Sequence, residues 1–86
     1  MKVKAYAKFR DLYRKLPPAI RRKALRQIHR LAQDLRHPSL QVKRIQGTPG
    51  IGEARVDIRY RMTFEFEGDI LFLRVIGDHD EVLRRP

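Results

Sequence analysis

Residues 53–86 read EARVDIRYRMTFEFEGDILFLRVIGDHDEVLRRP, and this stretch decides the fold. Between Ala54 and Glu67, apolar side chains alternate strictly with charged or polar ones. Such alternation is typical of β-strands that bury one face and expose the other. Gly68-Asp69 then separates this run from the apolar segment 70–77, and a two-residue connection that begins with Gly indicates a tight hairpin. The stretch therefore predicts two antiparallel strands joined by that turn.

The turn also fixes the register of the hairpin, because a two-residue loop places Glu67 opposite Ile70. The pairs expected on the apolar face are Phe66 with Leu71, Phe64 with Leu73, and Met62 with Val75. The pairs expected on the polar face are Glu65 with Phe72, Thr63 with Arg74, and Arg61 with Ile76. Arg61 and Arg74 are then diagonal neighbours, and His79 follows the second strand on the side of Arg61. The register predicts that two arginines and a histidine converge on the polar face.

Two amphipathic helices are expected before the hairpin. After a short strand at residues 3–6, apolar residues at helical spacing predict a helix from Phe9 to Leu16, which Pro17-Pro18 ends. A second apolar stripe predicts a helix from Pro18 to Leu35, because proline is tolerated in a first helical turn. Two such helices form an αα-hairpin, and the inner face of the sheet can cover their apolar stripes.

The remaining segments read as connections. Residues 36–52 are punctuated by Pro and Gly and predict a loop. The alternating run is longer than an ordinary strand of about 5–6 residues, so we expect a break near residues 57–59. A short turn or helix is expected from Asp80. The predicted order is β-α-α-β-β-β in a single α+β domain spanning residues 1–86, with an antiparallel sheet and the helix hairpin packed on one face.

The composition indicates an anionic partner. The 86 residues include 20 Lys and Arg against 10 Asp and Glu, a formal net charge of +10. Arginine predominates, and its guanidinium suits bidentate contacts with phosphate. Such a positive field favours nucleic acid or an acidic protein segment, while a merely soluble basic surface is the plainer interpretation. The chain has no cysteine, which excludes a disulfide framework and a thiol nucleophile. It also shows no secretory signal and no apolar run of membrane length, so a cytoplasmic protein is expected.

Three segments carry a resemblance to a known family: Glu53-Ala54-Arg55, Tyr60-Arg61-Met62-Thr63-Phe64 and Gly77-Asp78-His79-Asp80-Glu81-Val82. They resemble the RelE/ParE toxin superfamily of bacterial type II toxin–antitoxin systems, and the likeness extends to Leu16-Pro17 and to residues 37–40. The resemblance implies a RelE-like fold and a ribosome-dependent mRNA endoribonuclease that inhibits translation. It also implies a cognate antitoxin that covers the site and through which the complex would bind operator DNA.

The candidate catalytic residues are His79, Arg61 and Arg74. RNA cleavage without a metal or other cofactor needs a proton acceptor, a proton donor and cations that stabilise the phosphorane. The only side chain in this group that titrates near neutrality is His79, while Arg61 and Arg74 would hold the phosphate. Residues expected to position the RNA substrate are Lys43, Arg44 and Arg55. By resemblance, His79 and Arg61 match positions that nuclease members of the family use, and Lys43 matches a loop lysine.

Alternative interpretations stay open for each group. Arg61 and Arg74 can instead form surface ion pairs with nearby acids. The basic helix face of Arg22, Arg26, His29 and Arg30 can follow nucleic-acid phosphates or simply be solvated, and the family resemblance adds that an antitoxin can wrap it. Nuclease members of the family usually carry an aromatic residue where this chain has Leu83. That departure favours a second function, a non-catalytic ParE-like toxin that inhibits DNA gyrase; a third is a plain basic module that binds nucleic acid or the ribosome.

Overall fold

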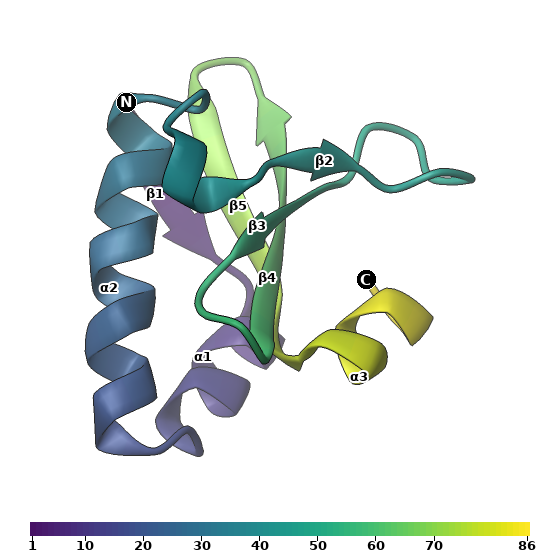
Figure 1. The fold of residues 1–86 in the computed structure, drawn as a ribbon. Helices are drawn as coiled ribbons and strands as arrows, with labels where there is room; N and C mark the ends of the chain where they lie inside the picture. Colours follow the sequence, from purple (N-terminus) through teal and green to yellow (C-terminus); the bar gives the residue numbers. More distant parts are fainter.

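A computed structural model describes residues 1–86 and contains three α-helices and a five-stranded sheet (Figure 1). The helices are α1 (Ala7–Arg14), α2 (Pro18–Gln33) and α3 (His79–Arg84), with a 3₁₀ turn η1 at Pro38–Leu40. The strands are β1 (Lys2–Ala5), β2 (Lys43–Arg44), β3 (Gly52–Arg55), β4 (Tyr60–Glu67) and β5 (Ile70–Asp78), in the spatial order β1-β5-β4-β3-β2. The α+β class is confirmed, and the predicted element order is correct except for one additional short strand, β2, in the segment that was expected to be a loop.

The sheet is mixed rather than purely antiparallel. Strand β1 pairs with β5 in parallel, Lys2 lying opposite Ile70, while β2 to β5 pair antiparallel as expected. The two helices carry the chain away from β1, so that β1 occupies one edge of the sheet and β2 the other. A crossover of this kind is what a parallel strand pair requires.

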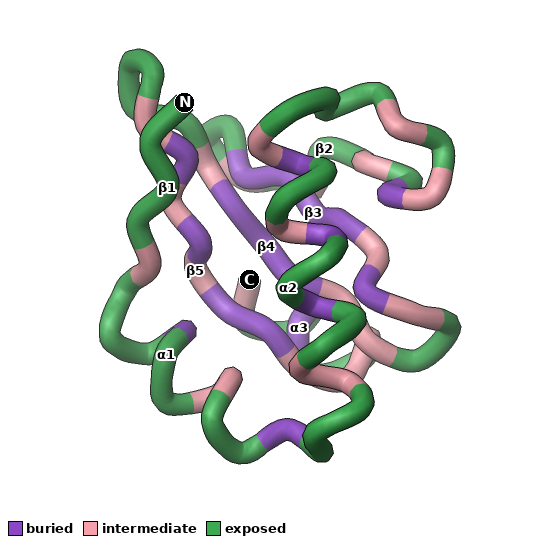
Figure 2. The backbone as a smooth tube through the Cα atoms, turned by 90° about the vertical axis from the view of Figure 1, so that its left-hand side faces the viewer, coloured by how far each residue is buried: buried purple, intermediate pink, exposed green.

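Helices α1 and α2 cover one face of the sheet, and α3 lies against the other (Figures 1 and 2). The core between the helix pair and the sheet is built from the side chains that the alternation assigned to the apolar face, among them Met62, Phe64 and Leu71. From the helices, Phe9 and Leu31 join it. On the far side, α3 is held by Val82, which is 3% exposed. None of the three helices combines the length and apolar content that crossing a bilayer demands.

The predicted hairpin register is correct near the turn and wrong beyond it. Glu67 lies opposite Ile70 and Phe64 opposite Leu73, but Met62 then lies opposite Ile76 and Arg61 opposite Gly77. A β-bulge causes the shift, because Arg74 and Val75 together oppose the single residue Thr63. The buried hydroxyl of Thr63 accepts a hydrogen bond from the N–H of Val75 at 3.2 Å. The expected pairs Met62 with Val75 and Arg61 with Ile76 are therefore replaced by pairs one residue further along β5.

The turn between β3 and β4 is made by Asp57 and confirms the predicted break. Its carboxylate accepts hydrogen bonds from the backbone N–H groups of Arg59 and Tyr60 at 2.8 and 2.9 Å. Burial raises the pKa of Asp57, but these two bonds and the Lys23 ammonium outweigh it and lower the pKa below its usual value. Aspartate thus supplies the turn chemistry for which Gly or Asn is commonly used.

The segment 36–52 is more ordered than a loop. It contains η1 and the short strand β2, which pairs with β3 and projects with its connecting loop as an arm from the edge of the sheet (Figure 1). The side chain of Gln27, from α2, reaches this region and donates to the carbonyl oxygens of Ser39 and Arg55.

Candidate functional site

The face of the sheet that carries α3 also carries the polar side chains of the alternating strands, and we call it the polar face. Strand pairing arranges its residues in levels that cross the sheet. One level runs Lys43–Glu53–Thr63 and ends at Arg74 and Val75; the next runs Arg55–Arg61–Gly77. Adjacent levels are about 7 Å apart along the strands. His79 comes next beyond the second level, where its backbone N–H donates to the carbonyl oxygen of Arg59 at 2.9 Å.

Arg55 and Arg61 lie directly opposite each other on β3 and β4. Neither guanidinium forms an ion pair with a carboxylate. Arg61 Nη1 instead donates to the carbonyl oxygens of Asp57, at 2.7 Å, and Tyr60, at 3.2 Å, which holds its side chain at the β3–β4 turn. Like charges that face each other across strands repel. A bound anion would relieve that repulsion, so this pair is suited to holding a phosphate.

His79 is the first residue of α3, directly after the helix cap Asp78. Its side chain is 43% exposed, and its Nδ1 lies 3.5 Å from a carboxylate oxygen of Asp80. The imidazole is therefore accessible to a ligand and has a carboxylate beside it. The acids at 78–81 do not combine with it into a group of three or more side chains that could hold a metal ion.

Arg74 shares the polar face but contacts a different set of groups. Its Nη1 lies 2.8 Å from Glu65 Oε1, its Nε donates to the carbonyl oxygen of Pro86 at 3.2 Å, and its guanidinium lies 5.7 Å from the centre of the Tyr6 ring. The Tyr6 hydroxyl donates to the same oxygen of Glu65 at 2.7 Å. That hydroxyl lowers the pKa of Glu65; burial opposes the shift, and Arg74 adds to it.

The structure thus brings Arg61, Arg55 and His79 to one end of the polar face. Arg74 lies one level away, with its charge matched by Glu65. The two cations expected in the loop, Lys43 and Arg44, lie on opposite faces of the sheet. Lys43 is exposed on the level of Glu53, whereas Arg44 pairs with Gly52 and so belongs to the face that carries Phe64.

Glu53 is a residue of this face to which the sequence reasoning gave no role. It is 8% exposed, it pairs with both Lys43 and Thr63 across the strands, and its carboxylate forms no hydrogen bond or ion pair. No buried side-chain oxygen lacks a hydrogen-bond partner, so the carboxylate oxygens of Glu53 reach solvent, and an accessible carboxylate beside cations is a candidate acid–base group. Extending the alternation by one residue before Ala54 puts Glu53 in phase with Arg55, and that phase was the signal available.

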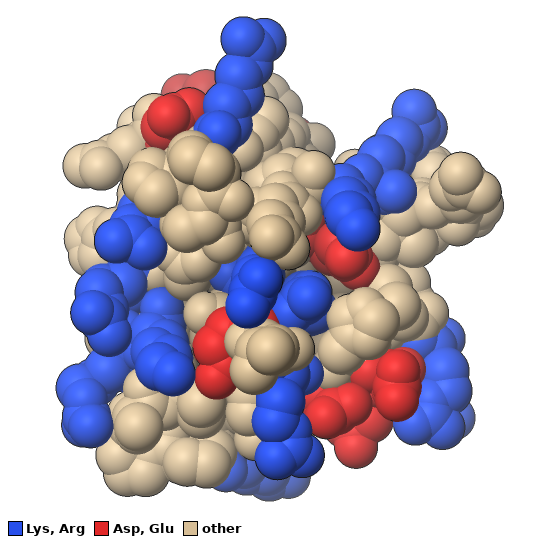
Figure 3. All heavy atoms as spheres, in the orientation of Figure 1, with Lys and Arg blue, Asp and Glu red and all other residues tan.

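The space-filling view shows how the charges gather (Figure 3). Lys and Arg atoms line the outer edge of the molecule over α2, and more of them lie over the sheet and on the arm that carries β2, next to acidic atoms. The Lys and Arg side chains thus form separate groups over α2, over the sheet and on the arm. Leu83, in contrast, is 40% exposed on α3 and offers no aromatic ring.

Comparison with solved structures identifies the fold. No protein-family model matches the chain, and no curated protein matches it in sequence. A chain of the RelB-RelE antitoxin-toxin complex from Methanococcus jannaschii superposes with a TM-score of 0.76 at 19% identity, over 95% of this chain and 98% of that one. YafQ from E. coli gives a TM-score of 0.79 at 13% identity, over 94% and 96%. The YoeB/ParE toxin from Agrobacterium tumefaciens gives 0.78 at 15%, over 92% and 99%. The chain therefore has the fold of the RelE, YafQ and YoeB/ParE toxins.

Proposed function

We propose that the chain is the toxin of a type II toxin–antitoxin pair and that it cleaves mRNA on the ribosome without a metal ion. The observation that carries this proposal is the grouping of two unpaired arginines, Arg55 and Arg61, with the accessible imidazole of His79 and the unpartnered carboxylate of Glu53. The fold shared with RelE and YafQ supports it.

The proposed chemistry is an attack by the ribose 2′-hydroxyl on the neighbouring phosphorus. The proton of that hydroxyl passes to a base, the bond from phosphorus to the 5′ oxygen breaks, and an acid protonates the departing oxygen. The products are a 2′,3′-cyclic phosphate and a 5′-hydroxyl, so atoms and charge balance. Glu53 is suited to the base and His79 to the acid, because the Arg55–Arg61 level lies between them along the strands. The arginines would stabilise the charge that develops on the phosphate oxygens.

The cations outside this group have positioning roles in the proposal. Lys43, exposed on the level of Glu53, would contact a phosphate of the same RNA strand. Arg44 projects from the opposite face of β2 and would contact the ribosome or a more distant part of the message. Arg74, paired with Glu65, would act on the edge of the site rather than on the reacting phosphate.

The test is expression of the wild type and of His79→Ala in a translating extract, with mapping of mRNA 5′ ends. We expect cuts in phase with the ribosome in the wild type, and a loss of rate of about 100- to 10,000-fold in the variant. His29→Ala is the matched control, because His29 is an exposed histidine on α2 and its removal should leave cleavage intact. Equal cleavage by His79→Ala and wild type would refute His79 as the acid.

A second candidate function is inhibition of DNA gyrase without catalysis. Leu83 favours it, since its exposed side chain occupies the position where the resemblance implies an aromatic residue. Intact message in the translating extract, together with inhibition of supercoiling by the purified protein, would establish that function instead.

The proposed partner follows from the same relatives. The RelE structures from Methanococcus jannaschii and E. coli and the YafQ structure with DinJ are toxin–antitoxin complexes. An antitoxin with an acidic segment would complement the net charge of +10 and cover the polar face. Binding of operator DNA would then be carried by the antitoxin.

A further inference from the structure

A cavity of about 410 Å³ opens beside β5, away from Glu53, Arg55 and Arg61. It is lined by Tyr6, Lys8, Arg74, Val75, Arg85 and Pro86. It exists because β1 pairs with β5 only as far as Leu73, so that residues 74–78 of β5 have no neighbouring strand on that side. The start of α1 and the end of α3 form the walls.

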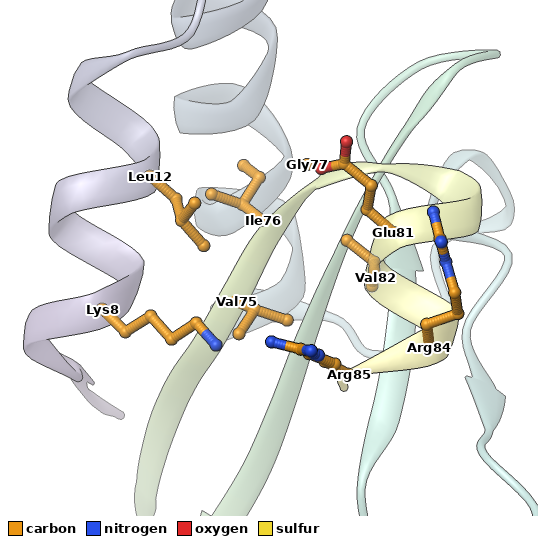
Figure 4. A pocket seen from close by; sticks show the side chains of 9 residues that line it. All are labelled: Lys8, Leu12, Val75, Ile76, Gly77, Glu81, Val82, Arg84 and Arg85. Atoms are coloured by element: carbon orange, nitrogen blue, oxygen red, sulfur yellow. The ribbon is translucent and has the colours of Figure 1, made fainter.

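The cavity combines free positive charge with a flat aromatic wall. Lys8 and Arg85 are both exposed, and neither forms an ion pair or a side-chain hydrogen bond. Their side chains approach each other over Val75, one from α1 and the other from the end of α3 (Figure 4). No Asp or Glu side chain lines this cavity. The main-chain oxygen of Pro86 already accepts from Thr63 and Arg74, and the charge of Arg74 is matched by Glu65. Two unmatched cations that face each other are favourable when an anion lies between them.

The wall is built from Tyr6 and Arg74. The Tyr6 side chain is 41% exposed, its ring stacks on Phe72 at a centroid distance of 5.5 Å and an angle of 18°, and the Arg74 guanidinium lies 5.7 Å from it. Hydrogen bonds to Glu65 hold both groups in place. Aromatic rings and guanidinium planes are the surfaces on which unpaired bases of single-stranded RNA stack.

We propose that this cavity binds one nucleotide of an RNA strand, with the base against Tyr6 and Arg74 and the phosphate between Lys8 and Arg85. The proposal rests on the proposed function for the identity of the RNA. It adds a subsite away from the reacting phosphate, and it supplies a stacking surface that Leu83 does not. RNA is favoured over an acidic peptide because the stacking wall and the two cations line one cavity, as a base and its phosphate require.

A second cavity, of about 360 Å³, continues the first along β5 and shares Lys8, Val75 and Arg85 with it. It is lined in addition by the carboxylate of Glu81 and by the apolar side chains of Leu12, Ile76 and Val82 (Figure 4). A carboxylate repels phosphate, so the second cavity does not extend the phosphate site. The nucleotide is therefore assigned to the first cavity alone.

The test measures binding without cleavage, using a 2′-O-methyl uridine trinucleotide that has no free 2′-hydroxyl to attack the phosphate. Affinity is measured by fluorescence anisotropy for the wild type, for Lys8→Gln/Arg85→Gln and for Lys15→Gln/Arg36→Gln. The last variant is the matched control, because it removes the same charge from exposed residues that line neither cavity. We expect a loss of affinity of about tenfold in the first variant and less than about threefold in the control. The slope of log affinity against log salt should fall by about 0.7, the value for one phosphate of a single strand.

The stacking wall is tested by Tyr6→Leu and Tyr6→Phe, each checked for folding by circular dichroism. Tyr6→Phe keeps the ring and loses only the hydrogen bond to Glu65, so it should bind the trinucleotide as the wild type does. Tyr6→Leu should bind about tenfold more weakly, in line with about 1–3 kcal/mol for stacking of one base. Equal affinity in the cavity variants and their controls, or no binding by the wild type, would overturn the proposal. So would binding of a polyglutamate peptide, but not of the trinucleotide, through Lys8 and Arg85. Because binding is read without cleavage, loss of this subsite is distinguishable from loss of the nuclease function.

Discussion

Thr63 is the residue whose removal should most clearly reveal how the β-bulge is held. Its side chain is fully buried; its hydroxyl accepts from the N–H of Val75 at 3.2 Å and donates to the carbonyl oxygen of Pro86 at 2.8 Å. Thr63→Val keeps the shape of the side chain and removes both bonds. The Val75 N–H would then be buried without a partner, which costs about 1–3 kcal/mol, and the bond to Pro86 is worth about 1 kcal/mol more.

The matched variant is Thr63→Ser, which keeps the hydroxyl and both bonds and loses one buried methyl group, worth about 1 kcal/mol. We therefore expect Thr63→Val to lower the free energy of unfolding by roughly 2–4 kcal/mol, well beyond the loss in Thr63→Ser. In a domain of this size each kcal/mol shifts Tm by about 4–8 °C, so the difference is readily measured.

The assay is urea unfolding followed by far-ultraviolet circular dichroism, since the chain contains no Trp to report by fluorescence. The midpoint should fall while the slope with urea stays unchanged, because the surface exposed on unfolding is the same. If Thr63→Val is as stable as Thr63→Ser, the hydroxyl does not support the bulge and the reasoning is refuted.

Three further predictions concern single contacts. Gly52→Ala should lower the free energy of unfolding by about 1–3 kcal/mol, because a Cβ there would lie 2.7 Å from the ring of Phe64. Adding Phe64→Leu should recover part of this loss. If the two substitutions have additive effects in the double variant, the clash is contradicted. The pKa of Glu65 is lowered in the folded chain. The ionised carboxylate therefore stabilises the folded state above its unfolded-state pKa of about 4.3, and this contribution is lost as the pH falls through the folded-state pKa. The Tm advantage of the wild type over Glu65→Gln should accordingly shrink from pH 7 to pH 3, whereas parallel Tm curves would exclude this role. Gln27→Leu should cost about 1–3 kcal/mol in urea unfolding, because it leaves two carbonyl oxygens without their donor, while Gln33→Leu on the exposed side of the same helix should be nearly neutral.

Much of the fold could be predicted from local chemistry. The alternation in residues 54–67, the Gly68-Asp69 turn and the proline corner at residues 17–18 each depend on neighbouring residues alone, and each predicted the correct element. The partner of β1 could not be predicted in this way. A four-residue strand with two lysines has no pattern that selects an edge of the sheet, and its parallel pairing depends on where the two helices return the chain.

The candidate site was predictable in its residue types more than in its geometry. The bulge at Arg74-Val75 contains no glycine that would predict it from the sequence. The hydrogen bond that stabilises it comes from Thr63 on the neighbouring strand. The position of Arg74 depends on Glu65 and on Tyr6, which lies far away in the sequence. Glu53 had the correct phase, but only its low exposure of 8% and its place between Lys43 and Thr63 in the folded sheet distinguish it from an ordinary surface acid.

The pairing of β1 with β5 also governs the order in which the sheet can form during synthesis. Strand β1 leaves the ribosome well before β5, the strand with which it pairs, because more than 60 residues separate Ala5 from Ile70. A chain emerges from its N-terminal end, and contacts between distant segments form only once both are available. The parallel edge of the sheet and the cavity beside β5 therefore take shape only after β5 has left the ribosome.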